Sequence, residues 1–145
     1  MRTALLLASA SLIGAPIPEK WTEALALVES GDNHLAYGDG TSARGPHQFH
    51  RAAWADVTKM RKAQGKTTWT YTKARTRYAS YAYAETWLTF LRDQIKQMTG
   101  REPTAQQVFL AHNMGLEGFR AIGFDPHRAP HERFDAANRF ATLAK

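Results

Sequence analysis

One stretch of this 145-residue chain decides its fold class: residues 77–99, RYASYAYAETWLTFLRDQIKQMT. Apolar and aromatic residues recur in it at spacings of three and four, at Tyr81, Ala84, Leu88, Leu91, Ile95 and Met98. This spacing places them on one face of an α-helix, and we expect that face to line the core. Gly100 follows directly and is suited to end the helix.

Shorter helices are predicted on both sides of this one. Trp21, Leu25 and Val28 share one helix face, and Gly31 is suited to end that helix. Further helices are expected over residues 51–64, 104–113 and 131–143. The second of these three opens with a capping box, residues 104–107, TAQQ. Helices therefore account for most of the expected structure.

A β element is expected between the first two helices. Residues 31–45 are rich in glycine, aspartate and other turn formers. They predict a loop or a small hairpin, with short strands at residues 35–37 and 47–49. The fold class is therefore mainly α, a helical domain with a small β-hairpin element after the first helix.

The composition fits one globular domain with an anionic partner. Hydrophobic residues make up 43% of the chain and charged residues 22%, which is enough apolar side chain for a core. The formal net charge of +6 predicts a partner such as an acidic cell-wall glycan, nucleic acid or a membrane surface. There is no cysteine, which excludes thiol catalysis and thiolate metal sites.

The first fifteen residues are distinct from the domain expected over residues 16–145. Thr3 to Ala15 carries no charge and follows Arg2. This segment is too short for an integral membrane span, which needs about 20 residues. It is typical of a secretory signal peptide and predicts export to the periplasm or outside the cell. A packed N-terminal helix is the alternative.

Glu29 is the first candidate for chemistry, because it stands where a helix pattern ends. The negative end of the helix dipole and apolar neighbours both disfavour a carboxylate, so Glu29 is expected to hold its proton more tightly than usual. A general acid that cleaves glycosides needs this property at neutral pH. The plainer interpretation is a solvated residue in the last turn of a helix.

Two later segments carry amides that could line a sugar-binding cleft with Glu29. Residues 45–49, GPHQF, offer the amide of Gln48 and a glycine that permits close approach of a backbone. Residues 111–115, AHNMG, offer Asn113, either as a helix cap or as an amide turned into the same cleft.

Taken in order, these segments resemble the lysozyme-like superfamily of soluble lytic transglycosylases and goose-type lysozymes. Glu29-Ser30 resembles the family's catalytic Glu-Ser pair. Residues 45–49 resemble its Gly-Leu-Met-Gln-Ile motif, and residues 111–115 resemble its Ala-Tyr-Asn-x-Gly motif. Two positions depart from the family: His112 replaces a tyrosine, and Phe140 is the nearest counterpart of a late tyrosine. The chain therefore resembles a divergent member.

The resemblance implies an α+β lysozyme-like fold and cleavage of the β-1,4 bond between N-acetylmuramic acid and N-acetylglucosamine of peptidoglycan. Glu29 would be the single acid/base of a lytic transglycosylase, which forms a 1,6-anhydro end. A lysozyme-type hydrolase would need a second carboxylate. Asp39 is better placed for this role than Asp32, although the Gly-Asp-Gly sequence around Asp39 is also that of a normal tight turn. The candidate substrate-binding residues are Ser30, Gln48, Asn113 and Asp39, and no cofactor is implied.

Two non-enzymatic interpretations stay open. One is a cell-wall glycan-binding module of the same fold. The other is a nucleic-acid binder, because residues 59–77 hold seven basic side chains and no acid, with Trp69, Tyr71 and Tyr78 close by. No nucleic-acid-binding motif accompanies this charge, and a solvated face with core aromatics is the plainer interpretation. No histidine or acid cluster has the spacing of metal ligands.

Overall fold

The computed structural model describes residues 15–38 and 42–145, and this part of the chain is mainly helical. Its six α-helices and two short 3₁₀ helices are, in chain order, α1 (Glu19–Ser30), α2 (Arg51–Ala63), η1 (Tyr71–Arg75), α3 (Arg77–Thr99), α4 (Ala105–Met114), α5 (Leu116–Ala121), η2 (Pro126–Arg128) and α6 (His131–Leu143). Within the described residues, no helix has the length and hydrophobicity of a membrane span.

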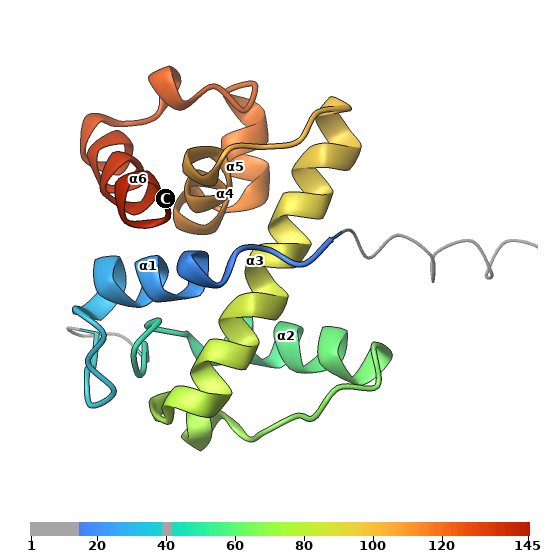
Figure 1. Cartoon of the computed structure of the whole chain (residues 1–145), viewed down its shortest axis with the longest axis vertical. Helices are drawn as coiled ribbons and strands as arrows, with labels where there is room; N and C mark the ends of the chain where they lie inside the picture. The colour runs from blue at the N-terminus through green and yellow to red at the C-terminus, as the bar shows by residue number, and fades with distance from the viewer. Residues whose placement is uncertain (1–14, 39–41) are drawn as a thin grey trace, which may run out of the picture.

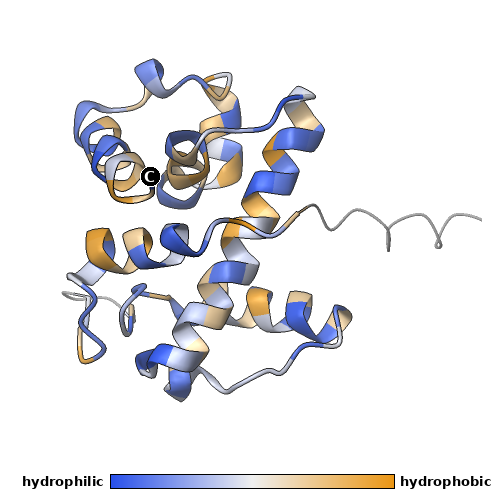
Figure 2. Cartoon of the chain, viewed as in Figure 1, coloured by the Kyte–Doolittle hydropathy of each residue, from blue (hydrophilic) through white to orange (hydrophobic). Residues whose placement is uncertain are grey.

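Helix α3 is the central element of the molecule (Figure 1). Helix α2 and η1 pack beside its N-terminal half, and α4 packs beside its C-terminal half together with α5 and α6. Helix α1 contacts both α3 and α6, so it lies between the two groups of helices. Hydrophobic and hydrophilic positions alternate along these helices, as Figure 2 shows, because each buries one face.

The predicted core stripe of α3 is confirmed at its four central positions. Ala84, Leu88, Leu91 and Ile95 are at most 1% exposed. The prediction is wrong for Met98, which is 41% exposed in the last turn of α3. Tyr81 is half-buried because its hydroxyl reaches out to hydrogen-bond Asp32, and Tyr83 is the fully buried tyrosine of this helix.

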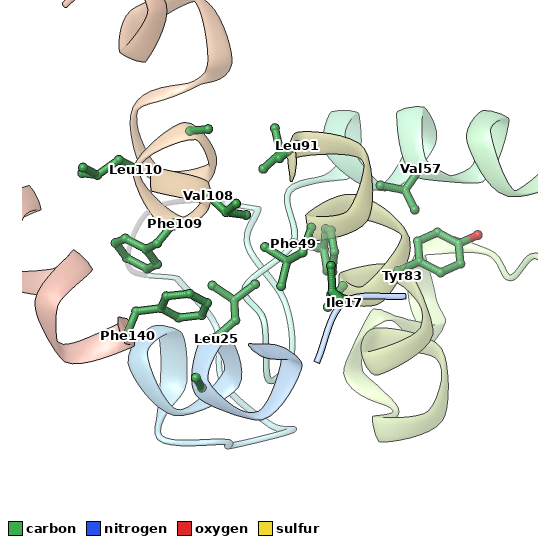
Figure 3. Close-up of a cluster of buried hydrophobic side chains, with 14 of the residues drawn as sticks. Ile17, Leu25, Phe49, Val57, Tyr83, Leu91, Val108, Phe109, Leu110 and Phe140 are labelled. Atoms are coloured by element: carbon green, nitrogen blue, oxygen red, sulfur yellow. The ribbon is translucent and has the colours of Figure 1, made fainter. Parts of the chain in front are cut away.

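Aromatic side chains join the helices around α1. Phe109 of α4 and Phe140 of α6 stack with ring centroids 5.2 Å apart, and both lie near Leu25 of α1 (Figure 3). Trp21 meets Phe140 edge to face, with centroids 6.4 Å apart. Such pairs add about 0.5–1.5 kcal/mol each to the stabilisation from buried area. They fix the position of α6 against both α1 and α4.

The predicted helix ends are confirmed. Gly31 and Gly100 adopt the left-handed conformation, with φ of 65° and 71°, directly after α1 and α3. At the start of α4 the Thr104 hydroxyl accepts from the Gln107 N–H at 3.2 Å, and the Gln107 side chain accepts from the Thr104 N–H at 2.9 Å. This is the capping box expected from residues 104–107.

The predicted β-hairpin is wrong for the described residues 31–38 and 42–49. They form only two isolated bridges, Tyr37 with Arg44 and Arg44 with Phe49. A strand needs consecutive extended residues, but Gly45 and Gln48 both have positive φ, at 76° and 51°. Arg44 and Phe49 instead exchange two backbone hydrogen bonds, of 3.0 and 3.1 Å, around a four-residue turn. Two further elements were not predicted from the sequence, η1 before α3 and α5 after α4.

Candidate active site at the end of helix α1

Glu29 lies in the last turn of α1 and faces His112 of α4. Its Oε1 is 3.1 Å from His112 Nε2, and the two side chains are only 23% and 20% exposed. Gly31 turns the chain away immediately after this turn, and the Asp32 N–H caps it by donating to Ala26 O at 2.9 Å. The carboxylate is therefore partly shielded and has one defined partner.

His112 is held on its other nitrogen by α3. The Trp87 indole N–H donates to His112 Nδ1 at 3.1 Å. Three helices thus contribute one hydrogen-bonded chain of side chains, from Trp87 through His112 to Glu29. The sequence identified His112 only as a departure from a motif. It carried no signal for Trp87, because the contact joins residues 25 apart on different helices.

Ser30 ties the loop that carries Gln48 to the end of α1. Its hydroxyl donates to Pro46 O at 2.7 Å and accepts from the Asn33 N–H at 3.0 Å. Both contacts are with the protein's own backbone. They place residues 45–49 directly beside Glu29, and the predicted substrate-binding residue Ser30 has a positioning contact here.

Gly45 is required by the packing of this loop on η1. A Cβ at this position would lie 2.0 Å from Ala74 O, and the backbone has φ of 76°. Only glycine tolerates both the left-handed conformation and this approach of another backbone. The glycine of the GPHQF segment is therefore explained by tertiary contact.

His47 anchors the same loop in the core between α1 and α3. It is 1% exposed, its Nε2 is 2.9 Å from Thr22 O, and its Nδ1 is 2.7 Å from Ser80 Oγ. The carbonyl can only accept, so the hydrogen is on Nε2 and Ser80 donates to Nδ1. Burial lowers the pKa of His47 to about 4, against the smaller opposing effect of the hydrogen bond to Thr22. His47 is therefore neutral at physiological pH.

The side-chain amide of Gln48 donates its hydrogen bonds within the loop. Its Nε2 donates to Gly45 O at 2.9 Å and to Ala36 O at 3.2 Å. The amide nitrogen therefore locks the turn to the segment that follows α1. What Gln48 can offer a ligand is its carbonyl oxygen, as an acceptor for a hydroxyl.

Asp32 follows α1 closely, but both its oxygens are engaged. Oδ1 accepts from the Tyr81 hydroxyl at 3.0 Å, and Oδ2 forms an ion pair with Arg77. Burial, reinforced by the hydrogen bond to Asp32, raises the pKa of Tyr81 to about 12. The pairing with Asp32 raises the pKa of Arg77. This carboxyl group therefore links the end of α1 to α3 through two side-chain contacts.

Asn113 makes its contacts on the side of α6. Arg133 donates to both its backbone oxygen and its Oδ1, each at 2.7 Å. The residue next to it, His112, contacts Glu29 instead. The structure therefore joins Glu29, Ser30 and the Gln48 loop through direct contacts, and it brings His112 in place of Asn113 to the carboxylate.

Other predicted residues lie outside this site. Asp39 and residues 1–14, most of the expected signal peptide, are outside the described residues. Phe140 is fully buried against Trp21 and Phe109, where a hydroxyl would need a partner. Two surface cavities, of about 470 and 440 Å³, lie at the start of α1 and beside η2, and Glu29 lines neither.

The basic stretch of residues 59–77 divides into buried and exposed groups. Arg61 is 6% exposed and donates to Thr67 O, Ala82 O and Thr86 Oγ1 at 2.7–2.9 Å. Arg75 instead lies near the surface, 4.5 Å from the ring centroid of Tyr37, which Arg44 contacts at 4.3 Å. Part of the charge is therefore structural, and part is available for a partner.

Neither a metal-binding cluster in the described residues nor a similar known protein helps to assign this site. Among the described residues, no group of three or more histidines and acids could hold a metal ion. No family model, no curated protein and no solved structure matches the chain.

Proposed function

We propose that this chain is a lysozyme-like peptidoglycan-cleaving enzyme, a lytic transglycosylase with Glu29 as its acid/base. The substrate bond is the β-1,4 bond between N-acetylmuramic acid and N-acetylglucosamine. The observation that carries the proposal is the partly shielded Glu29 at the end of α1, held by His112 and bordered by the Ser30-anchored loop. The order of these segments in the sequence supports it.

The chemistry requires one carboxyl group that first gives and then takes a proton. Protonated Glu29 donates to the glycosidic oxygen, and an oxocarbenium-like transition state forms at the muramyl ring. The resulting carboxylate accepts the N–H of His112, which stabilises the charge it has just gained. It then removes the proton of the muramyl 6-hydroxyl, whose oxygen attacks C1 and closes the 1,6-anhydro ring.

Transglycosylation is favoured over hydrolysis because Asp32, the described carboxylate that follows Glu29 in the chain, is already engaged by other side chains. Asp32 is held by Arg77 and Tyr81, so it is poorly suited to orient a water. Hydrolysis by a pair of carboxylates would therefore depend on Asp39, which the structure does not describe.

Digestion of isolated sacculi tests this proposal. Wild type should release muropeptides with anhydro ends, identified by mass spectrometry, and Glu29→Gln should lower release by about 100- to 10,000-fold without changing the melting temperature. Glu117→Gln is the matched control, because Glu117 is 79% exposed on α5. Activity of Glu29→Gln equal to wild type would refute the mechanism, and products with reducing ends would identify a hydrolase.

A second candidate function, binding of an anionic wall polymer without cleavage, is favoured by the cluster of Tyr37, Arg44 and Arg75. Both guanidinium groups pack on the half-exposed tyrosine ring. Among the described residues neither arginine forms a salt bridge; both are oriented by cation–π contact, and Arg44 also donates to Ala43 O at 3.1 Å. Phosphate or carboxylate groups of a wall polymer fit such paired guanidiniums.

Cosedimentation with sacculi separates the two candidates. The Glu29→Gln protein should still bind, and adding Arg44→Gln and Arg75→Gln should weaken binding and flatten its salt dependence. Replacing the exposed Arg128 and Arg139 by Gln is the charge-matched control. Equal binding by both double variants would rule out this cluster as the binding surface. Binding without release by wild type would favour the non-catalytic function.

A further inference from the structure

We propose that His112 is a positioning residue, fixed by Trp87 as the neutral tautomer with hydrogen on Nε2, which holds Oε1 of Glu29 and leaves Oε2 to meet the substrate. The inference rests on the proposed function for its catalytic consequence. Its structural part, the state of the imidazole, stands on the geometry of three described side chains.

The tautomer follows from the chemistry of the two partners. An indole N–H can only donate, so Trp87 requires a lone pair on His112 Nδ1. A neutral imidazole with an acceptor at Nδ1 carries its hydrogen on Nε2. That hydrogen points to Glu29 Oε1 at 3.1 Å. The Trp87 indole N–H, which can only donate, therefore determines that Nδ1 carries a lone pair and Nε2 carries the hydrogen.

The same contact opposes a second proton on the imidazole. A hydrogen on Nδ1 would face the indole N–H, so the charged form would lose the bond to Trp87 and gain a repulsive contact. Among the described residues, the charged or titratable groups that contacts place near His112 include Glu29 on α1, the buried neutral His47 of the loop, and Arg133 of α6, which binds the adjacent Asn113.

This arrangement suits an acid that must be protonated before it acts. A charged His112 would form an ion pair that holds Glu29 as a carboxylate and blocks proton donation. A neutral N–H donor still fixes the carboxyl plane and can follow Glu29 through both protonation states. Since Oε1 accepts from Nε2, the acidic hydrogen of Glu29 is carried by Oε2. General acid catalysis depends on this orientation.

The imidazole can be tested without any substrate. In ¹⁵N-labelled wild type at about pH 7, long-range proton–nitrogen correlations of His112 should show a protonated Nε2 and an unprotonated Nδ1. Trp87→Phe keeps an aromatic ring against Phe90 but removes the donor to Nδ1. Glu29 still accepts from Nε2, so the expected change is a shift of the Nδ1 resonance caused by the loss of its hydrogen bond. A wild-type ring with hydrogen on Nδ1, or no change in Trp87→Phe, would overturn the inference.

The catalytic part is tested by a matched pair of substitutions. His112→Gln places an amide N–H near the position of Nε2–H and cannot titrate, so it should keep most of the sacculus-cleaving activity. His112→Leu removes the donor and should lower kcat on the order of 100-fold with little change in KM. His131→Leu is the control, because His131 forms a similar but exposed pair with Asp135 at 3.2 Å.

The outcomes separate this inference from the proposed function. If Glu29→Gln is inactive and His112→Leu is fully active, the positioning role is wrong and the function stands. If His112→Gln is as impaired as His112→Leu, the N–H donor is not what His112 contributes. If Glu29→Gln is active, the proposed function fails, and the tautomer is still decided by the spectra. Melting curves of each variant exclude misfolding as the cause.

Discussion

Acidification should destabilise this protein through His47 before most carboxylates titrate. His47 has a pKa of about 4 in the folded protein because it is buried, whereas in the unfolded chain its pKa should be the ordinary 6.5 of an imidazole. At pH values between about 4 and 6.5, the His47 imidazole is protonated in the unfolded chain but neutral in the folded protein. Stability from the neutral imidazole is therefore complete above about pH 6.5 and is lost as the pH falls toward 4.

The size of this loss follows from the same two values. The full difference corresponds to about 3 kcal/mol, of which about 2 kcal/mol is lost between about pH 7 and pH 5. That is a large fraction of the stability of a typical domain. Because His47 joins the Gly45–Phe49 loop to Thr22 of α1 and Ser80 of α3, the acid-weakened contacts are those that hold the loop beside Glu29.

Urea unfolding of wild type and His47→Gln at about pH 7 and about pH 5 measures this loss of stability. The free energy of unfolding of wild type should fall by about 2 kcal/mol more than that of the variant. An NMR titration of the His47 ring in folded wild type gives the same test without a substitution. A native His47 that titrates near 6.5, or equal losses in both proteins, would refute the reasoning.

Three further substitutions test the loop and the helix caps by urea denaturation. Gly45→Ala should cost about 3 kcal/mol or more, because its Cβ would lie 2.0 Å from Ala74 O, and a loss below about 1 kcal/mol would contradict that packing. Ser30→Ala should cost only about 1 kcal/mol but should lower sacculus cleavage, since the contact with Pro46 is lost; unchanged cleavage would deny Ser30 a positioning role. Thr104→Ala should cost about 1 kcal/mol by removing the α4 cap, with cleavage unaffected as the check.

The helices were predictable because their signals are local. The spacing of Leu88, Leu91 and Ile95 reflects the helical period, and Gly100 and the Thr104 capping box satisfy backbone groups within a few residues. Such patterns depend on the chain alone. The same reasoning failed at Met98, because periodicity does not say where the neighbouring helix stops covering a face.

The segment after α1 was predicted less well because its conformation depends on distant partners. Turn formers indicated a hairpin, but Gly45 packs against Ala74 and His47 reaches Thr22 and Ser80. These contacts hold the loop in a tight turn with left-handed residues in place of paired strands. No local pattern in residues 31–49 contains that information.

Helix period and helix termination are local properties, so the order of the amino acids was enough to predict a mainly helical chain and to identify Glu29 as an acid at the end of a helix. The packing of the helices was needed to show which residues lie around Glu29. Ser30 was found to hold the loop, Asp32 to be neutralised by Arg77, and His112 to be the partner of Glu29. The physical reason is that hydrogen bonds between side chains on different helices depend on how the helices pack. That packing brings residues 83 positions apart within 3.1 Å.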